Sequence, residues 1–295
     1  MFFISPQTFL FSLLYLSLTL IIISLDNFFA YWVIIELRTL VFIGVSYSSF
    51  KNNFRILLVF FIIQTISAFR LLLFFIASSA LGFTFSLLIK LAMFPYHFWY
   101  FSLVPSFPNF ALFFSMTIFK IPSIYILRSF SHLLSYEILF LSSILTIMVG
   151  GFIMVFRNDL RLIVVGSSIA NNTWFVFSQL SRRFIFILYF SLYYIFLYMV
   201  FTKFSNLFSF SSQNTYFMKN YLVIFSLVTI SGLPPFPLFY VKMLIVLQLI
   251  SNLSLAFFIF VVILANVLVL LGYIKFIFNY MLNFYGNSNF LALSV

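Results

Sequence analysis

Long apolar segments follow one another along nearly the whole chain and are separated by short polar loops. Ten of them predict helices, with approximate ranges 9–25, 28–49, 54–77, 80–100, 107–128, 137–157, 159–180, 184–202, 221–247 and 252–276. An α-helix of about twenty apolar residues crosses a hydrocarbon core about 30 Å thick. The longest loop, 203–220, is too short for a domain outside the membrane. The pattern predicts an all-α polytopic membrane protein with a single integral membrane domain over 1–295.

Two of the ten segments contain residues that interrupt a helix. The fourth contains Pro95, and the ninth contains SGLPPFP, whose helix-breaking residues are Gly232, Pro234, Pro235 and Pro237. Proline removes a backbone donor and clashes with the preceding turn, so neither helix is expected to be continuous. The alternative is that these prolines only kink continuous membrane helices.

The positions of the two interruptions suggest an internal symmetry. If the segments form two sets of five, about 9–128 and 137–276, an interrupted helix is the fourth member of each set. Because five is odd, the second set then crosses the membrane in the opposite direction. Transporters built from inverted repeats have this arrangement, with their site near the membrane midplane.

Charge and composition narrow the possible functions. The net charge is +11, but the fifteen Lys and Arg are scattered among short loops, which argues against a nucleic-acid partner. Seven loop cations lie on the side that carries both termini and three on the other, which predicts termini in the cytoplasm or the mitochondrial matrix. The first segment has no signal-peptide or presequence pattern, and a Phe-rich chain without Cys would suit synthesis inside an organelle.

Residues that bind metals and redox cofactors are scarce. The chain has no Cys and two His. Thiolate iron–sulfur clusters and zinc–thiolate sites are therefore excluded, and two histidines cannot supply the four axial ligands of a two-haem cytochrome. We expect no metal site and no redox cofactor on this chain.

Four ionisable side chains lie near the middle of predicted helices, namely Glu36, Lys90, Lys120 and Lys242. Each costs about 2.5 to 3.5 kcal/mol at the bilayer centre unless it is paired or hydrated. Burial disfavours the charged form of an amine, which lets a buried lysine exchange a proton near neutral pH. A carboxylate such as Glu36 would hold that proton when close and release it when withdrawn. The alternatives are a structural ion pair and, for Lys120 and Lys242, snorkelling to the membrane surface.

Each of these lysines is also close to a proline in the sequence, in the pairs Lys90–Pro95, Lys120–Pro122 and Lys242–Pro237. A proline leaves a carbonyl of the preceding turn without its donor, and such carbonyls, together with water, can solvate an ammonium group. The spacing therefore predicts that helix breaks, including one at Pro122, provide polar surroundings for the lysines.

Three other polar residues lie within or beside the predicted helices. His97 lies just beyond the first break, and either passes protons toward one surface or is simply hydrogen-bonded. Asn171 lies within the seventh segment, and either holds water or bonds across helices. Arg38 is two residues from Glu36, which places it on a different face of a helix, and we expect it to be structural.

Four stretches of the chain together resemble the antiporter-like proton-pumping subunits of respiratory complex I. They are WVIIEL with Glu36, KLAMFPYHFW with Lys90 and His97, FKIP with Lys120, and SGLPPFPLFYVK with Lys242. The resemblance implies that Glu36 and Lys90 form a charge pair coupled to Lys120, and that Lys242 leads toward the proton exit. It also implies two inverted five-helix repeats.

The resemblance further implies a location and partners. The chain would lie in the mitochondrial inner membrane, beside other membrane-arm subunits of complex I and phospholipids such as cardiolipin. NADH, FMN, iron–sulfur clusters and ubiquinone would be bound by partner subunits. Many family members have a histidine where this chain has Asn171, and a final helix expected after residue 276 is missing or reduced.

Two other function classes share some of these features. A stand-alone cation/proton antiporter also has broken helices and buried lysines, but it would be expected to keep an acidic cation site. The acidic residues are Asp26, Glu36, Glu137 and Asp159, and only Glu36 is near mid-span. A structural assembly protein with incidental charges would not explain three lysines near mid-span beside three proline breaks.

Overall fold

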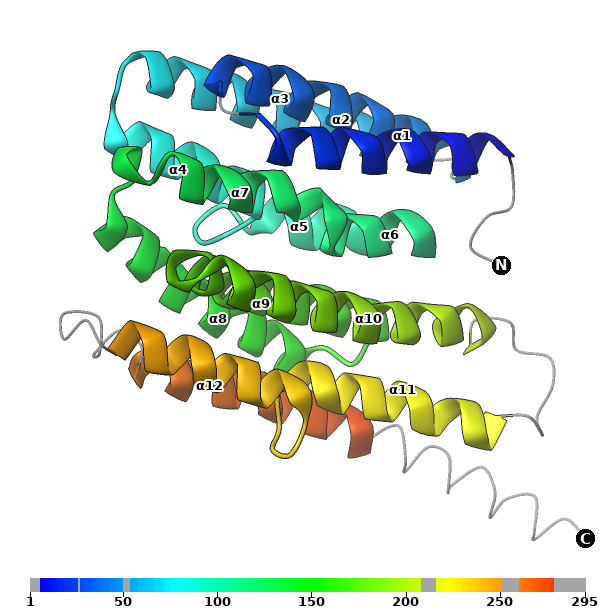
Figure 1. Ribbon diagram of the computed structural model, residues 1–295. Helices are drawn as coiled ribbons and strands as arrows, with labels where there is room; N and C mark the ends of the chain where they lie inside the picture. Colours follow the sequence, from blue (N-terminus) through cyan, green and yellow to red (C-terminus); the bar gives the residue numbers. More distant parts are fainter. Residues whose placement is uncertain (1–5, 26, 50–53, 208–215, 251–259, 279–295) are drawn as a thin grey trace, which may run out of the picture.

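The computed structural model describes residues 6–25, 27–49, 54–207, 216–250 and 260–278. Regular structure in these ranges is helical throughout, and the main helices lie roughly along one common direction. Figure 1 shows them stacked in sequence order, from α1, α2 and α3 at one end of the molecule to α11 and α12 at the other. The first residues of the tenth predicted segment, and any helix after 278, lie outside the described residues.

The helices coincide closely with the predicted segments. The uninterrupted ones are α1 (Pro6–Ile23), α2 (Phe28–Ser49), α3 (Phe54–Ile76), α8 (Tyr136–Phe156), α9 (Leu160–Ser181), α10 (Arg183–Leu207) and a helix over Phe260–Phe278. The remaining segments are divided into α4 (Ala80–Leu91) and α5 (Phe98–Leu103), α6 (Asn109–Met116) and α7 (Ile121–Ser129), and α11 (Tyr216–Ser231) and α12 (Pro237–Ile250). Short 3₁₀ turns η1 (Val104–Ser106), η2 (Ile118–Lys120) and η3 (Ser131–Leu133) connect neighbouring helices.

Within the described ranges, six helical stretches are long and apolar enough to cross a membrane, namely Phe28–Tyr47, Phe54–Ile76, Asn109–Ser129, Tyr136–Phe156, Arg183–Thr202 and Phe260–Phe278. These and other helices carry large apolar side chains on their outward faces, such as Leu20 of α1, Ile76 of α3 and Phe184 of α10, which are more than two-thirds exposed. An apolar outer surface of this extent is unfavourable in water and is suited to lipid. The chain is thus an all-helical, multi-pass membrane protein.

Helix α9 has the opposite character, because protein surrounds it on every side. Each residue from Ile163 to Gln179 is buried, including two serines, two asparagines and a threonine in the run Ser167–Thr173. A helix without lipid contact can carry polar groups, since neighbouring helices supply their hydrogen-bond partners. Helix α9 contacts α7, α8, α10 and α12, so it forms the polar centre of the bundle.

Two interruptions have matching backbone geometry. Helix α4 ends where Ala92 adopts the left-handed conformation, with φ of 53°, and α11 ends where Gly232 does the same, with φ of 78°. In both cases a proline follows three residues later, Pro95 and Pro235 respectively. A left-handed residue closes the last helical turn, and the proline prevents the helix from continuing.

The third interruption differs in place from its prediction. It begins at Thr117, whose φ of −114° and ψ of −91° end α6, and Pro122 lies in the first turn of α7. Proline is well tolerated there because the first amides of a helix have no intrahelical acceptor. Pro237 is likewise the first residue of α12. Both prolines therefore start a helix after an interruption that precedes them.

Glycines bring α8 into close contact with two neighbours. A Cβ atom on Gly150 would lie 2.7 Å from the carbonyl oxygen of Gly166 in α9. A Cβ atom on Gly151 would lie 2.7 Å from the Cβ atom of Leu268. A Cβ atom on Gly272 would lie 2.5 Å from the Cβ atom of Met154. Close backbone approach through small residues is a common way in which membrane helices associate, since they gain little from the hydrophobic effect.

Gly150→Ala is expected to destabilise the bundle by about 1 to 3 kcal/mol, because the new methyl group meets backbone atoms that cannot rotate away. Gly44→Ala is the matched control, since its methyl group would meet only the Phe11 ring, at 3.2 Å. Both glycines are helical, so the gain in helix propensity cancels between the two variants. Thermal denaturation of the protein in its native membranes should show a clearly lower midpoint for Gly150→Ala. Equal midpoints would mean that the α8–α9 contact is looser than described.

Candidate functional site

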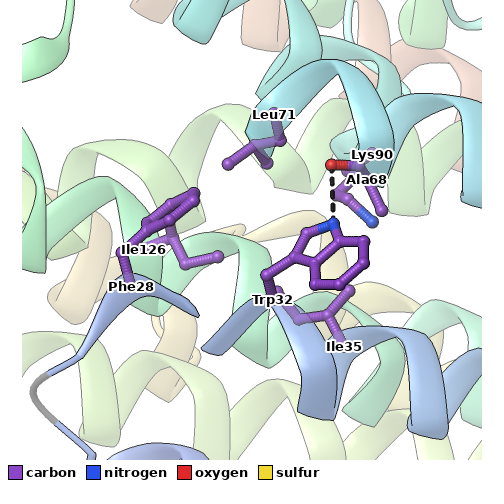
Figure 2. Close-up of a pocket in the computed structure, with 7 residues that line it drawn as sticks. All are labelled: Phe28, Trp32, Ile35, Ala68, Leu71, Lys90 and Ile126. Carbon is purple, nitrogen blue, oxygen red and sulfur yellow. Dashed lines mark hydrogen bonds between the residues drawn. The ribbon is translucent and has the colours of Figure 1, made fainter. Parts of the chain in front are cut away.

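Lys90 lies at the end of α4, in the last turn before the first interruption. Its side chain is only 6% exposed, and it borders an apolar pocket between α2, α3 and α7 (Figure 2). The other lining residues are Phe28, Trp32, Ile35, Ala68, Leu71 and Ile126. The indole Nε1 of Trp32 donates a hydrogen bond to the carbonyl oxygen of Ala68 at 3.0 Å, which fixes one wall of the pocket. The ammonium group thus lies inside the bundle rather than at its surface.

The other side of Lys90 is more polar. A cavity of about 20 Å³ adjoins it, lined also by Ile35, Arg38, Thr39, Gln64, Phe119, Pro122 and Ser123. That volume is close to the space that one water molecule needs. Glu36, on α2, is half-buried and lies near enough to attract the Lys90 ammonium, whereas Arg38 repels it. Lys90 is therefore subject to two opposing charges from the same helix.

Lys120 is the last residue of η2, within the interruption between α6 and α7. It is 2% exposed, and its Nζ donates a hydrogen bond to the carbonyl oxygen of Ser168 at 2.9 Å. The Tyr100 ring lies 5.2 Å from the same nitrogen, within the range of a cation–π contact. The hydroxyl of Ser168 in turn donates to the Tyr100 hydroxyl at 3.0 Å. The carbonyl that binds Lys120 belongs to the continuous helix α9 and not to a proline break.

Lys242 lies in α12 and returns toward the end of α11. Its Nζ donates to the carbonyl oxygen of Ser231 at 3.2 Å and to Oδ1 of Asn266 at 3.5 Å, and lies 5.2 Å from the Trp174 ring. A Cβ atom at Gly232 would lie 2.9 Å from this nitrogen. The glycine therefore leaves room for the ammonium group to reach the carboxyl end of α11, where the helix dipole is negative.

Helix α9 connects the surroundings of all three lysines. Ser168 binds Lys120, Trp174 lies beside Lys242, and Asn172 donates a hydrogen bond at 2.6 Å to the carbonyl oxygen of Leu91, next to Lys90. Ser168 and Trp174 are six residues apart, which corresponds to about 9 Å along the axis of an α-helix. The contacts made with the three lysine sites thus lie within a short length of one helix.

The two residues considered as relays have different surroundings. His97 is buried just before α5 and packs against the rings of Phe94 and Phe98, whose centroids lie 5.8 Å and 4.1 Å from its own. Asn171 accepts a hydrogen bond from the Tyr189 hydroxyl at 2.8 Å in the interior between α9 and α10. His97 therefore lies among aromatic rings, whereas Asn171 belongs to the polar centre of the bundle.

Several residues near the lysines were not identified from the sequence as functional candidates. Arg38 is buried, at 2% exposure, and donates to the carbonyl oxygen of Ile118, two residues before Lys120. The Tyr193 hydroxyl is buried without a hydrogen-bond partner in the described part of the chain, and the Tyr273 hydroxyl is buried beside Ser167. An arginine in mid-span is a visible signal in the sequence. Tyrosines are too frequent here, at seventeen, for the sequence to single out these two.

The described residues contain no cluster of three or more His, Asp or Glu that could hold a metal ion. The groups that surround Lys120 and Lys242 are carbonyl oxygens, an amide oxygen and aromatic faces, all of which favour a cation. These groups bind positive charge and accept hydrogen bonds, so they can stabilise an ammonium group that then passes a proton on.

The known proteins that are similar to this chain in sequence all have the same name. No protein-family model matches the chain. The NADH-ubiquinone oxidoreductase chain 2 of Caenorhabditis elegans is 33% identical over 185 residues, which is 61% of this chain and 62% of that protein. The chain 2 proteins of Artemia franciscana and Paracentrotus lividus are 28% and 27% identical, covering 76% and 88% of this chain and 74% and 80% of their own lengths. The chain thus spans a little under two-thirds of the Caenorhabditis elegans relative.

Solved structures show the same fold at low sequence identity. A chain of respiratory complex I from Thermus thermophilus with bound aureothin has a TM-score of 0.66 and 16% identity, covering 82% of this chain and 63% of that one. A chain of the membrane-bound sulfane sulfur reductase, an archaeal respiratory membrane complex, has a TM-score of 0.68 and 13% identity, covering 83% and 60%. Sequence and fold agree: the chain is similar in sequence to NADH-ubiquinone oxidoreductase chain 2 proteins, and it shares its fold with a chain of respiratory complex I.

Proposed function

We propose that this chain is a proton-translocating subunit in the membrane arm of respiratory complex I. Electron transfer from NADH to ubiquinone, with FMN and iron–sulfur clusters, takes place on other subunits in this proposal, and this chain moves protons in response. The observation that carries it is the burial of three lysines beside interrupted helices, at 6%, 2% and 5% exposure for Lys90, Lys120 and Lys242. Buried ionisable residues in a membrane protein mark proton or ion pathways by default.

Proton loading begins at Lys90 in this mechanism. The Glu36 carboxylate attracts a proton onto the amine, and withdrawal of that carboxylate lets the proton leave, because burial alone disfavours an ammonium group. The adjoining cavity has room for about one water molecule, which would connect the amine to neighbouring polar groups. A lysine suits this task because its flexible stem lets the amine swing between partners.

Transfer then proceeds from Lys120 to Lys242 along helix α9. Lys120 is bound to Ser168 and Lys242 lies beside Trp174, so the path between them passes the Asn171–Tyr189 hydrogen bond. Asn171 cannot titrate, and its role in the proposal is to hold hydroxyl and water groups in line. His97 is a second possible relay, on the side of the first interruption. Lys242, at the end of the path, leads toward the proton exit.

The proposal includes ten membrane spans arranged as two inverted repeats, over about 9–128 and 137–276. The equal spacing from Ala92 to Pro95 and from Gly232 to Pro235, with a left-handed residue at each helix end, supports this arrangement. Together with six long apolar helices, the shorter apolar helices Phe9–Ile22, Ala80–Leu91 and Pro237–Ile250 would complete most of the spans. The polar helix α9 would cross the membrane inside the bundle.

The proposal also assigns the chain to the mitochondrial inner membrane, as an organelle-encoded protein with both termini on the matrix side. Its neighbours would be other membrane-arm subunits and phospholipids such as cardiolipin. The outward apolar side chains support this, because they need either lipid or partner helices to cover them. A stand-alone antiporter would instead need no such partners.

Native electrophoresis of gently solubilised membranes should show the chain in a large assembly that oxidises NADH. The physical reason is that a subunit without redox centres must be coupled to the subunits that carry them. Migration of the whole population as a single small species, separate from NADH oxidation, would contradict the proposal and favour a stand-alone transporter.

Lys90→Met should abolish or sharply reduce proton pumping while the assembled complex stays largely intact. Methionine fills a similar volume but binds no proton, so only the carrier is lost. The measurement is the number of protons moved per NADH oxidised in inner-membrane vesicles. Lys275→Met is the control, since Lys275 is exposed at the end of its helix. A normal ratio in Lys90→Met would refute its role as a carrier.

Glu36→Gln should give a milder loss of pumping than Lys90→Met. Glu36 is only half-buried, so water can partly replace its charge beside Lys90. The matched control is Glu137→Gln, which changes an exposed carboxylate in the first turn of α8. Lost assembly together with unchanged pumping in the remaining complexes would instead identify Glu36 as a structural residue.

A further inference from the structure

Arg38 is a buried charge that the mechanism above does not use. Its Nη2 donates to the Tyr15 hydroxyl at 2.8 Å and to the carbonyl oxygen of Ile118 at 2.9 Å, and its guanidinium carbon lies 4.5 Å from the centre of the Tyr15 ring. These partners are neutral, and Nε has no hydrogen-bond partner in the described part of the chain. An arginine at membrane depth without a carboxylate partner is costly, so it is expected to have a function.

The contact with Ile118 places Arg38 at the third interruption. Ile118 begins η2, directly after Thr117 ends α6, and Lys120 is the last residue of the same turn. The guanidinium therefore connects α2 to a point two residues from Lys120. Because one guanidinium nitrogen binds both α1 and η2, Arg38 limits how far the interrupted backbone can move away from α2.

Arg38 also borders the cavity beside Lys90. Both side chains line the cavity of about 20 Å³, together with Gln64 and Ser123. Nε2 of Gln64 is also buried without a partner in the described ranges. Two positive groups thus border a space of about one water molecule, so their charges repel each other across it.

We propose that Arg38 is a positioning residue of the proton path, which holds the interrupted chain beside Lys120 and places a fixed positive charge across the small cavity from Lys90. The proposal rests on the proposed function. A guanidinium keeps its proton, so Arg38 acts through its two neighbours and does not carry protons itself. Without its repulsion, the Lys90 proton would be held too firmly by Glu36 to be passed on.

The decisive experiment compares Arg38→Gln, Glu36→Gln and the double variant in the assembled complex, by protons moved per NADH oxidised. Arg38→Gln is expected to reduce pumping about threefold or more. The double variant should pump better than Arg38→Gln alone, because both opposing charges are removed together; coupling of this size is usual for groups in one network. If Arg38 had only a structural role, the losses of pumping in the two single variants would add up in the double variant.

Conservative replacement gives an independent readout. Arg38→Lys keeps the positive charge but cannot reproduce the hydrogen-bond geometry of the guanidinium, so it should pump better than Arg38→Gln and less well than the wild type. Arg70→Gln is the matched control, since Arg70 is exposed on α3. If Arg38→Gln does not assemble, Tyr15→Phe is the second variant, because it removes one hydrogen bond of the guanidinium and keeps its charge. It should lower pumping in the complexes that assemble. Normal pumping by Tyr15→Phe would overturn the proposal.

The failures of the two proposals are distinguishable. If Lys90→Met loses pumping and all Arg38 variants pump normally, the role of Arg38 is refuted and the proposed function stands. If Lys90→Met pumps normally, the proposed function itself fails. Additive losses in the double variant, with Arg38→Lys as poor as Arg38→Gln, would leave Arg38 as a packing residue only.

Discussion

The arrangement of the whole chain depends on the solvation of ammonium groups where there is no bulk water. A lysine at membrane depth must find oxygen atoms within the protein, and a continuous helix offers few, because its carbonyls already accept bonds from its own amides. Interrupted helices release carbonyls at their ends, as Ser231 does for Lys242. Aromatic faces supply further attraction for the positive charge, as Tyr100 does for Lys120.

The position of helix α9 follows from the same need to keep polar groups away from lipid. Its sequence is too polar to face lipid, and each of its residues from Ile163 to Gln179 is buried inside the bundle. Asn172 satisfies the end of α4 at Leu91, and Ser168 offers a carbonyl to Lys120 from the middle of a regular helix. The second contact requires a carbonyl oxygen to accept two bonds, which its two lone pairs allow. The bundle is therefore organised around a buried helix that carries polar groups within an otherwise apolar core.

Hydropathy and proline positions predicted the helices and two of the three interruptions well, because both signals are local. The start of the third interruption was not predictable, since Thr117 is an ordinary helix residue and the nearby Pro122 merely begins α7. Arg38 was judged from its spacing to Glu36 on one helix. Its actual partners, Tyr15 and Ile118, come from other helices, and such contacts depend on packing that no local pattern contains.

The chemistry of the surroundings suits lysines rather than carboxylates as the proposed proton carriers. The polar atoms that bind Lys120 and Lys242 are acceptors, namely two backbone carbonyls and the Asn266 side-chain oxygen. Acceptors stabilise an ammonium group and still accept a hydrogen bond from the neutral amine, so the site suits both protonation states. A carboxylate in the same place would face oxygen lone pairs with nothing to donate to it. The surroundings of Lys120 and Lys242 therefore suit an amine that can lose its charge and still keep hydrogen bonds.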